Sequence, residues 1–343
     1  MASINASGLL TAVGPGIATI TVSVTYGGKT VSDTYSVKVN ADLSLATLKN
    51  AGKSLLKPGR NQYSVLGKMS SKVTATAKSS KLSVNVEQAP TVPGTAIVTV
   101  SEPVTGDVQS YYVNFGTKGV PDEFNNNSLG SQWKVIRRND ENLWIDNGWL
   151  SIIAETGDIN GTSDNAANMI LQSANTDWTI ETRLATNAVP VSAQNAGLVA
   201  YQDDSHFVKL VYTAAGFRRG QQAAAPAPAS GNVQLYVEEN GSSKSTVSVS
   251  LAGAEIKNNN IYLKLDKDGS IYTAYYSVDG KSWVQAGQAD ISLKDIQAGV
   301  MACQGVMNMR MGMRPGGAAA AAPAQQNNAQ FRANFDWFRI KNR

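Results

Sequence analysis

Short runs of alternating apolar and polar residues, separated by tight-turn signals, fill the chain from residue 143 to its end. The turn signals are Asp146-Asn147-Gly148, Asn240-Gly241, Asp268-Gly269 and Asp279-Gly280, where a left-handed backbone costs little. An alternation of period two buries one face of a strand. The pattern predicts an all-β fold and favours a jelly roll over any helical fold. The predicted strands are 143–153, 178–185, 196–202, 206–212, 233–239, 244–251, 261–266, 271–278, 297–303 and 330–341.

The length of 343 residues predicts more than one domain, because a single hydrophobic core rarely serves so long a chain. Residues 1–40 resemble the closing half of a bacterial immunoglobulin-like domain, and such a half is too short to bury a core alone. Residues 41–117 resemble a cadherin-like or immunoglobulin-like β-sandwich spacer. Residues 118–343 form the predicted jelly-roll module. We therefore expect tandem sandwiches followed by a jelly roll.

Composition argues against several functional classes. The formal net charge is only +4 and the basic residues are scattered, so nucleic-acid binding gains no support. A single cysteine, Cys303, and a single histidine, His206, leave no disulfide framework and too few ligands for a structural zinc site. No apolar run is long enough to predict a membrane-spanning helix.

The ends of the predicted jelly roll carry a family resemblance. The residues concerned are 122–125 (DEFN), 128–133 (SLGSQW) and 334–340 (NFDWFRI). Together with the strand pattern, they resemble the concanavalin A-like β-sandwich at the C-terminus of glycoside hydrolase family 43 β-xylosidases and arabinofuranosidases. The resemblance implies an accessory module with an upstream catalytic domain as partner. Trp133 and residues 137–142 match the N-terminal loop of such modules.

Catalysis by this chain itself finds little support in the sequence. A glycosidase needs two carboxyl groups across a sugar-binding cleft. The pattern Glu-x-Asp-x-x-Glu is absent, and the members of the pairs Asp203-Asp204 and Glu238-Glu239 point to opposite faces or lie in a turn. His206 has no serine on a nucleophile elbow beside it. We predict no catalytic residue here and leave open whether the whole protein is an enzyme.

Alternation within the predicted strands also identifies a possible sugar platform. Carbohydrates are recognised by aromatic rings and by planar polar side chains. If the strands concerned neighbour one another in one curved sheet, their outward residues form a single patch; the alternative is an ordinary solvated sheet face. The residues of this predicted patch are Glu181, Arg183, Lys209, Gln234, Tyr236, Tyr262 and Lys264.

No cofactor is required by this interpretation, but a structural calcium ion is possible. Asp122 and Asp336 lie in the first and last predicted strands, which we expect to pair side by side. They could share calcium with backbone carbonyls, or they could cap turns. Two low-complexity inserts, 221–231 and 307–330, are expected to be surface loops or rims of a ligand groove.

The sequence thus predicts the non-catalytic C-terminal region of a secreted bacterial glycoside hydrolase. It would bind plant polysaccharide of the xylan or arabinan type, or brace the catalytic domain, outside the cell or at its surface. One alternative is a structural or adhesive surface protein in which the sandwiches are spacers and the lectin-like module meets another protein. A free-standing enzyme is a third hypothesis, which predicts turnover of aryl glycosides.

Overall fold

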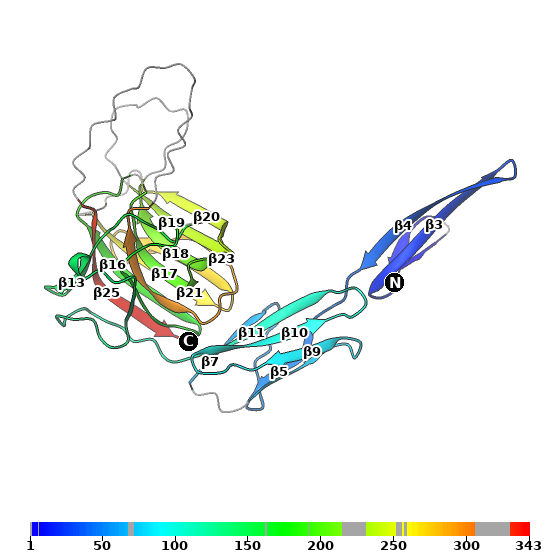
Figure 1. Cartoon of the computed structure of the whole chain (residues 1–343), viewed down its shortest axis with the longest axis horizontal. Helices are drawn as coiled ribbons and strands as arrows, with labels where there is room; N and C mark the ends of the chain where they lie inside the picture. Colours follow the sequence, from blue (N-terminus) through cyan, green and yellow to red (C-terminus); the bar gives the residue numbers. More distant parts are fainter. Residues whose placement is uncertain are drawn as a thin grey trace, which may run out of the picture. The chain divides into compact units, whose positions relative to one another are not determined.

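The computed structural model describes residues 2–5, 7–67, 72–161, 163–191, 193–214, 231–251, 256, 259–305 and 330–343. The predicted inserts lie outside these residues, apart from Gly231 and Gln330. Strands and one short 3-10 helix, η1 (Asp140–Asn142), make up the regular structure of the described residues, so the all-β prediction is confirmed (Figure 1). None of their helices is long and apolar enough to cross a membrane.

The chain divides into two compact units. The N-terminal unit comprises Met1–Tyr63 and Lys68–Phe115, and the C-terminal module comprises Ser64–Gly67 and Gly116–Arg343. The N-terminal boundary predicted at residue 40 is not tested by this division and stays a prediction.

A long hairpin begins the N-terminal unit. Strand β1 (Ala2–Ile4) pairs with β2 (Leu10–Ala12), and β3 (Gly16–Tyr26) pairs with β4 (Lys29–Val39) across the Gly27-Gly28 turn. One face of this hairpin is a ladder of serine and threonine pairs, such as Ser23 with Ser32. The other face exposes apolar side chains, including Val24 and Val31. Two strands provide no second layer to cover them.

Two further sheets complete the N-terminal unit. The first has the order β6-β5-β8 and the second the order β7-β11-β10-β9. Alternate side chains of both are buried, among them Leu48, Val98 and Val113. The strands are β5 (Leu45–Asn50), β6 (Lys53–Ser54), β7 (Gln62–Leu66), β8 (Val73–Ala77), β9 (Ser83–Glu87), β10 (Gly94–Ser101) and β11 (Val108–Gly116).

The C-terminal module consists of two stacked antiparallel sheets, each with seven strands among the described residues (Figure 1). Sheet I has the order β12-β15-β24-β17-β18-β19-β20, and sheet II has the order β13-β14-β25-β16-β21-β22-β23. Side chains such as Leu210 of sheet I and Trp178 and Phe335 of sheet II are fully buried in the core between them.

The strand bounds of sheet I are β12 (Lys134–Ile136), β15 (Met169–Ser173), β24 (Gln297–Cys303), β17 (Asn195–Asp203), β18 (His206–Thr213), β19 (Asn232–Glu239) and β20 (Ser242–Ser250). Those of sheet II are β13 (Leu143–Asp146), β14 (Trp149–Ile153), β25 (Arg332–Asn342), β16 (Trp178–Thr186), β21 (Asn260–Asp268), β22 (Ile271–Ser277) and β23 (Val284–Asp290).

The two ends of the module lie side by side, as predicted. Asp122 and Phe338 form a β-bridge in which each backbone N–H donates to the other residue's carbonyl at 2.8 Å. Beside the bridge, the Trp133 ring packs between Phe124 and Phe338, with centroids 6.2 and 5.1 Å away. This aromatic cluster joins the first residues of the module to its last strand.

A segment between β14 and β15 covers the outer face of sheet I. This segment, residues 154–161 and 163–168, is called the strap below. Its Ile159 and Ala166 are buried in a second hydrophobic cluster with Val199, Phe207 and Met301 of sheet I. Both faces of sheet I are therefore buried where the strap lies, whereas the core covers only the inner face of sheet II.

Candidate functional site on the outer face of sheet II

The predicted single patch does not exist, because its residues lie in two different sheets. Strands β16 and β21 are neighbours in sheet II, whereas β18 and β19 are neighbours in sheet I. Glu181, Arg183, Tyr262 and Lys264 therefore belong to one outer face, and Lys209, Gln234 and Tyr236 belong to the other. Alternation correctly separated outward from inward positions, but it could not show which strands pair.

On sheet I the strap covers the predicted residues. Lys209 is only 3% exposed, and its ammonium donates to the Asp158 carboxylate of the strap at 2.6 Å. The Tyr236 hydroxyl donates to Asn160 of the strap and lies 3.0 Å from a Glu238 carboxylate oxygen. Burial leaves Lys209 and Tyr236 no surface for a sugar, so these two assignments were wrong. Gln234 is half-buried on the same face.

The four residues on sheet II are brought together by its register. Glu181 stands directly opposite Lys264, and Arg183 directly opposite Tyr262, across the β16–β21 pair. Directly opposite residues of an antiparallel pair share a face and lie about 4.5–5.5 Å apart at Cβ. On the other side of β16, strand β25 adds Trp337 opposite Arg183 and Arg339 opposite Glu181.

Cationic side chains lie over aromatic rings across this face. The Arg183 guanidinium carbon lies 5.1 Å from the Trp149 ring centroid and 6.0 Å from that of Tyr262. The Lys264 ammonium lies 4.7 Å from the Tyr275 centroid and 4.1 Å from that of Trp283. Such contacts fix long, flexible side chains in place. We call this face the sheet II platform: Trp149, Glu181, Arg183, Tyr262, Lys264, Tyr275, Trp283, Trp337 and Arg339.

The last strand supplies a further stacked pair. The Arg339 guanidinium carbon lies 4.1 Å above the Trp337 ring, and two of its nitrogens donate to the Glu123 carboxylate at 2.9 and 3.0 Å. These hydrogen bonds hold the pKa of Glu123 below its usual value. The sequence pattern of β25 could have revealed Trp337 and Arg339, because they alternate with the core residues Phe338 and Ile340.

A hollow of about 420 Å³ lies in this face, lined by Thr179, Glu181, Lys264, Asp266, Arg339, Ile340 and Lys341. The Asp266 carboxylate already accepts from the Thr179 hydroxyl and pairs with Arg343 at 2.8 Å. The Glu181 carboxylate has no hydrogen bond or ion pair with any residue that the structure describes. The Glu181 carboxylate can accept hydrogen bonds from the hydroxyl groups of a ligand, and the neighbouring cations Lys264, Arg339 and Lys341 can donate to them.

The carboxylates considered for catalysis are each engaged by protein groups. Asp203 accepts from the Ser205 N–H and lies 2.8 Å from the His206 ring; burial raises its pKa, but these hydrogen bonds outweigh it and lower the pKa overall. Asp204 forms two hydrogen bonds with Arg137. Glu238 is buried, and Glu239 pairs with Lys244 at 2.9 Å.

Asp122 and Asp336, the predicted calcium ligands, interact with different protein groups. Asp122 accepts from the Phe124 N–H through one oxygen and from the Gln132 and Trp133 side chains through the other. Asp336 pairs with Arg183 at 2.9 Å. The described residues contain no group of three or more histidine, cysteine or acidic side chains placed to hold a metal ion. A calcium ion at this point stays a prediction.

The loop residues matched to the family's N-terminal loop are also fixed within the module. Trp133 is 9% exposed and belongs to the core, so it presents no free aromatic surface. Arg137 donates to the Ala166 carbonyl of the strap as well as to Asp204. Arg137 thus secures the strap, whereas Arg138 and Asp140 of the same loop are exposed.

Comparison with known proteins assigns the module to a family. Residues 121–341 match the model of the β-xylosidase C-terminal concanavalin A-like domain. None of the curated proteins searched matches the chain.

Several solved structures of glycoside hydrolase family 43 proteins are similar to the chain. BlXynB of Bacillus licheniformis is 16% identical, with 79% of this chain and 56% of that chain covered and a TM-score of 0.48. The xyloglucan PUL protein GH43B of Bacteroides ovatus is 14% identical, with 99% and 70% covered and a TM-score of 0.46. Xylan β-1,4-xylosidase of Bacillus halodurans is 12% identical, with 96% and 64% covered and a TM-score of 0.45.

The chain thus spans little more than half the length of the Bacillus licheniformis protein. The family assignment rests on the match to the domain model, which covers well over half of this chain. The chain belongs to the β-xylosidase C-terminal concanavalin A-like domain family and is related to the glycoside hydrolases of family 43.

Proposed function

We propose that the chain is the non-catalytic accessory region of a secreted bacterial glycoside hydrolase and binds polysaccharide through the sheet II platform. Xylan and arabinan are the first substrates to test, because the family is named for β-xylosidases. An upstream catalytic domain would be the partner that cleaves the bound chain.

The observation that carries this proposal is the Glu181 carboxylate, which has no hydrogen bond to a described residue and shares a hollow with Lys264, whose ammonium lies over the Tyr275 and Trp283 rings. Sugars present hydroxyl groups at their edges and C–H groups on their faces. Charged and aromatic side chains on one rigid sheet complement both. The cation–aromatic contacts hold Arg183 and Lys264 in place before binding, which reduces the entropy lost on association.

Affinity electrophoresis on a panel of soluble polysaccharides tests the proposal. We expect at least one glycan to retard the chain. The retardation should be lost in the Glu181→Ala plus Lys264→Ala variant and reduced in Tyr262→Ala. The matched control is Lys244→Ala, an exposed lysine on β20 of sheet I. Its retardation should equal that of the unmodified chain.

Three results would contradict the proposal. Retardation that survives in the double variant would place glycan binding elsewhere on the molecule. Absence of retardation by every glycan would favour the structural or adhesive alternative, in which the module contacts another protein. Turnover of aryl glycosides by the chain alone would contradict its non-catalytic character.

A further inference from the structure

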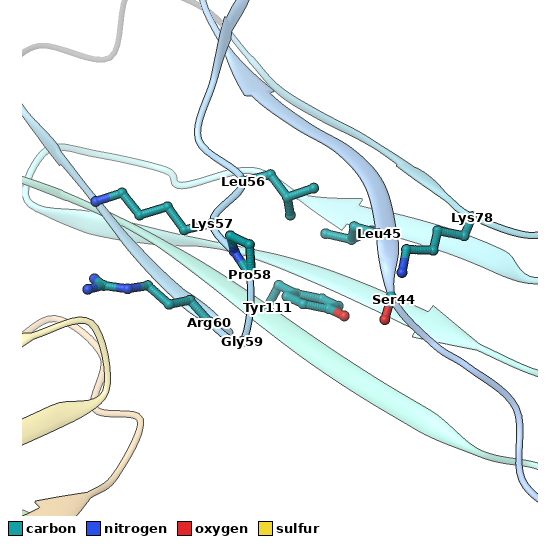
Figure 2. Close-up of a pocket in the computed structure, with 9 residues that line it drawn as sticks. All are labelled: Ser44, Leu45, Leu56, Lys57, Pro58, Gly59, Arg60, Lys78 and Tyr111. Carbon is teal, nitrogen blue, oxygen red and sulfur yellow. The ribbon is translucent and has the colours of Figure 1, made fainter.

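A second recess lies in the N-terminal unit, far along the sequence from the sheet II platform. It has a volume of about 430 Å³, within the ~300–1,000 Å³ typical of small-ligand sites. The loop that joins β6 to β7 forms one wall, and the starts or ends of β5, β8 and β11 contribute the rest. The lining residues are Ser44, Leu45, Leu56, Lys57, Pro58, Gly59, Arg60, Lys78 and Tyr111 (Figure 2).

The middle of this recess is apolar and well anchored. Figure 2 shows Leu45, Leu56, Pro58 and Tyr111 gathered in its centre. Leu45 is 2% exposed and Tyr111 is 8% exposed, so both are held by the core of the unit. The Tyr111 hydroxyl donates to the Leu43 carbonyl at 3.1 Å, and burial raises the pKa of this phenol. A ligand would therefore meet the exposed Pro58 and the half-buried Leu56, which lie over the fixed base formed by Leu45 and Tyr111.

The rim of the recess is cationic. Lys57 and Arg60 extend at one end of Figure 2, and Lys78 lies near Ser44 at the other. No carboxylate lines the recess. The nearest one to pair with the rim is Asp42, 3.7 Å from the Lys78 ammonium, and both partners are more than half exposed. Pairs of this kind contribute about 0–1 kcal/mol in water, so Lys78 stays available to a ligand.

The Lys57 ammonium is available to a ligand. Its ammonium has no hydrogen bond or ion pair with any residue within the described ranges, and its side chain is exposed. Asp42 is also already engaged, because the Ser44 hydroxyl and amide bind its carboxylate and lower its pKa. Lys57 and Lys78 thus offer two positive charges at the rim, against the single Asp42 carboxylate at its edge.

We infer that this recess binds an acidic oligosaccharide, that is, one carrying uronic acid residues. A sugar ring would rest its C–H face on Pro58 and Leu56, the apolar lining residues that are accessible. Its carboxylates would pair with Lys78 at one end or with Lys57 at the other. Charge-assisted hydrogen bonds from ammonium and guanidinium groups to carboxylates are stronger than neutral ones. Charge complementarity therefore favours uronates over neutral sugars of the same size.

Titration calorimetry of the whole chain with trigalacturonate and with the neutral xylotriose tests this inference. We expect measurable binding of trigalacturonate and at least tenfold weaker binding of xylotriose. The Lys57→Gln plus Lys78→Gln variant should weaken trigalacturonate binding at least tenfold. The matched control is Lys49→Gln plus Lys53→Gln, two exposed lysines of the same unit that do not line the recess.

Each contrary outcome is distinct. No binding of trigalacturonate, or equal binding of xylotriose, overturns the inference. An equal loss in the Lys49→Gln plus Lys53→Gln control means that the unit attracts polyanions without a site, which also overturns it. Circular dichroism should confirm that both double variants fold. The result is independent of the proposed function, because the sheet II variants leave this recess intact and these variants leave the sheet II platform intact.

Discussion

The two outer faces of the C-terminal module are built from the same kind of alternating strand, yet only one of them is open. On sheet I, Lys209 stands opposite Tyr236 and both are buried beneath the strap. On sheet II, Lys264 stands opposite Tyr275, and both stay half-exposed. The lysine–tyrosine pair of sheet I is therefore buried and contacts the strap, whereas the pair of sheet II is accessible to solvent.

The ammonium groups of the two lysines have different partners. The Lys209 ammonium is paired with Asp158 and packed near Phe207 and Tyr236, so its charge is satisfied inside the protein. The Lys264 ammonium contacts only aromatic rings in the described part of the chain, so it retains hydrogen bonds for a ligand. We conclude that the strap buries the outer face of sheet I at Lys209 and Tyr236, whereas the outer face of sheet II stays accessible at Lys264 and Tyr275.

Alkaline titration should reveal the largest contrast. Burial raises the pKa of Tyr236 and of the Cys303 thiol to about 12, and that of Tyr201 well above its usual range. In the unfolded chain these groups ionise near their ordinary values of 10.0 for tyrosine and 9.0 for cysteine. The unfolded state therefore loses protons first, and stability present below about pH 9 is lost as pH approaches 12. We expect the C-terminal module to unfold in this window.

Tryptophan fluorescence can follow this unfolding, because all six tryptophans lie between residues 133 and 337 and thus report only the C-terminal module. Absorbance at 295 nm should show Tyr236 and Tyr201 ionising together with unfolding. A native spectrum at pH 12 with these tyrosines already ionised would contradict the view that the strap seals this face.

Breaking the buried ion pair should cost most among single substitutions. Lys209→Met leaves the Asp158 carboxylate buried without its partner, and losses of about 3–5 kcal/mol are typical of that situation. Lys264→Met removes a partly exposed cation from two rings and should cost about 1 kcal/mol or less. Urea unfolding monitored by tryptophan fluorescence measures both.

A double variant sharpens this comparison. Asp158→Leu plus Lys209→Met removes both charges, so most of the stability lost in Lys209→Met should return. If the double variant is as unstable as the single one, the loss comes from packing and not from an uncompensated charge. Equal losses in Lys209→Met and Lys264→Met would remove the distinction between the two faces.

The sequence predicted the fold of the C-terminal module well, because alternation and turn glycines mark each hairpin. Nine of the ten predicted segments each correspond to one strand, the segment 143–153 is the β13–β14 hairpin, and the Asp122–Phe338 bridge joins the ends as expected. Strands β12, β15 and β23 were missed. Strand β15 shows no alternation because Met169 through Gln172 are buried on both faces. Strands covered on both sides carry a continuous apolar run that lacks a period.

The candidate site was predicted only in part. Alternation identified Glu181, Arg183, Tyr262 and Lys264 as outward residues, and they do meet on one face. It also placed Lys209 and Tyr236 in this group. The alternation within a strand shows neither which strands pair nor which loop covers a face of the sheet. One local signal was available: Asp158, Asn160 and Gly161 lie in a long turn-rich segment whose polar groups need partners.

The smallest expected difference in stability between the two faces comes from removing one tyrosine hydroxyl group on each. Tyr236→Phe removes the donor that joins Asn160 of the strap to β19 beside the buried Glu238 carboxylate, so it should lower stability by about 1–3 kcal/mol. Tyr262→Phe removes a hydroxyl group that has no hydrogen bond to any described residue, so it should change stability by about 0.5 kcal/mol at most. Urea midpoints with unchanged m-values would establish both numbers. If the two variants are equally stable, the Tyr236 hydroxyl does not hold the strap, and the covering of sheet I rests on its other contacts, among them the Asp158–Lys209 pair, the Arg137–Ala166 hydrogen bond and apolar packing.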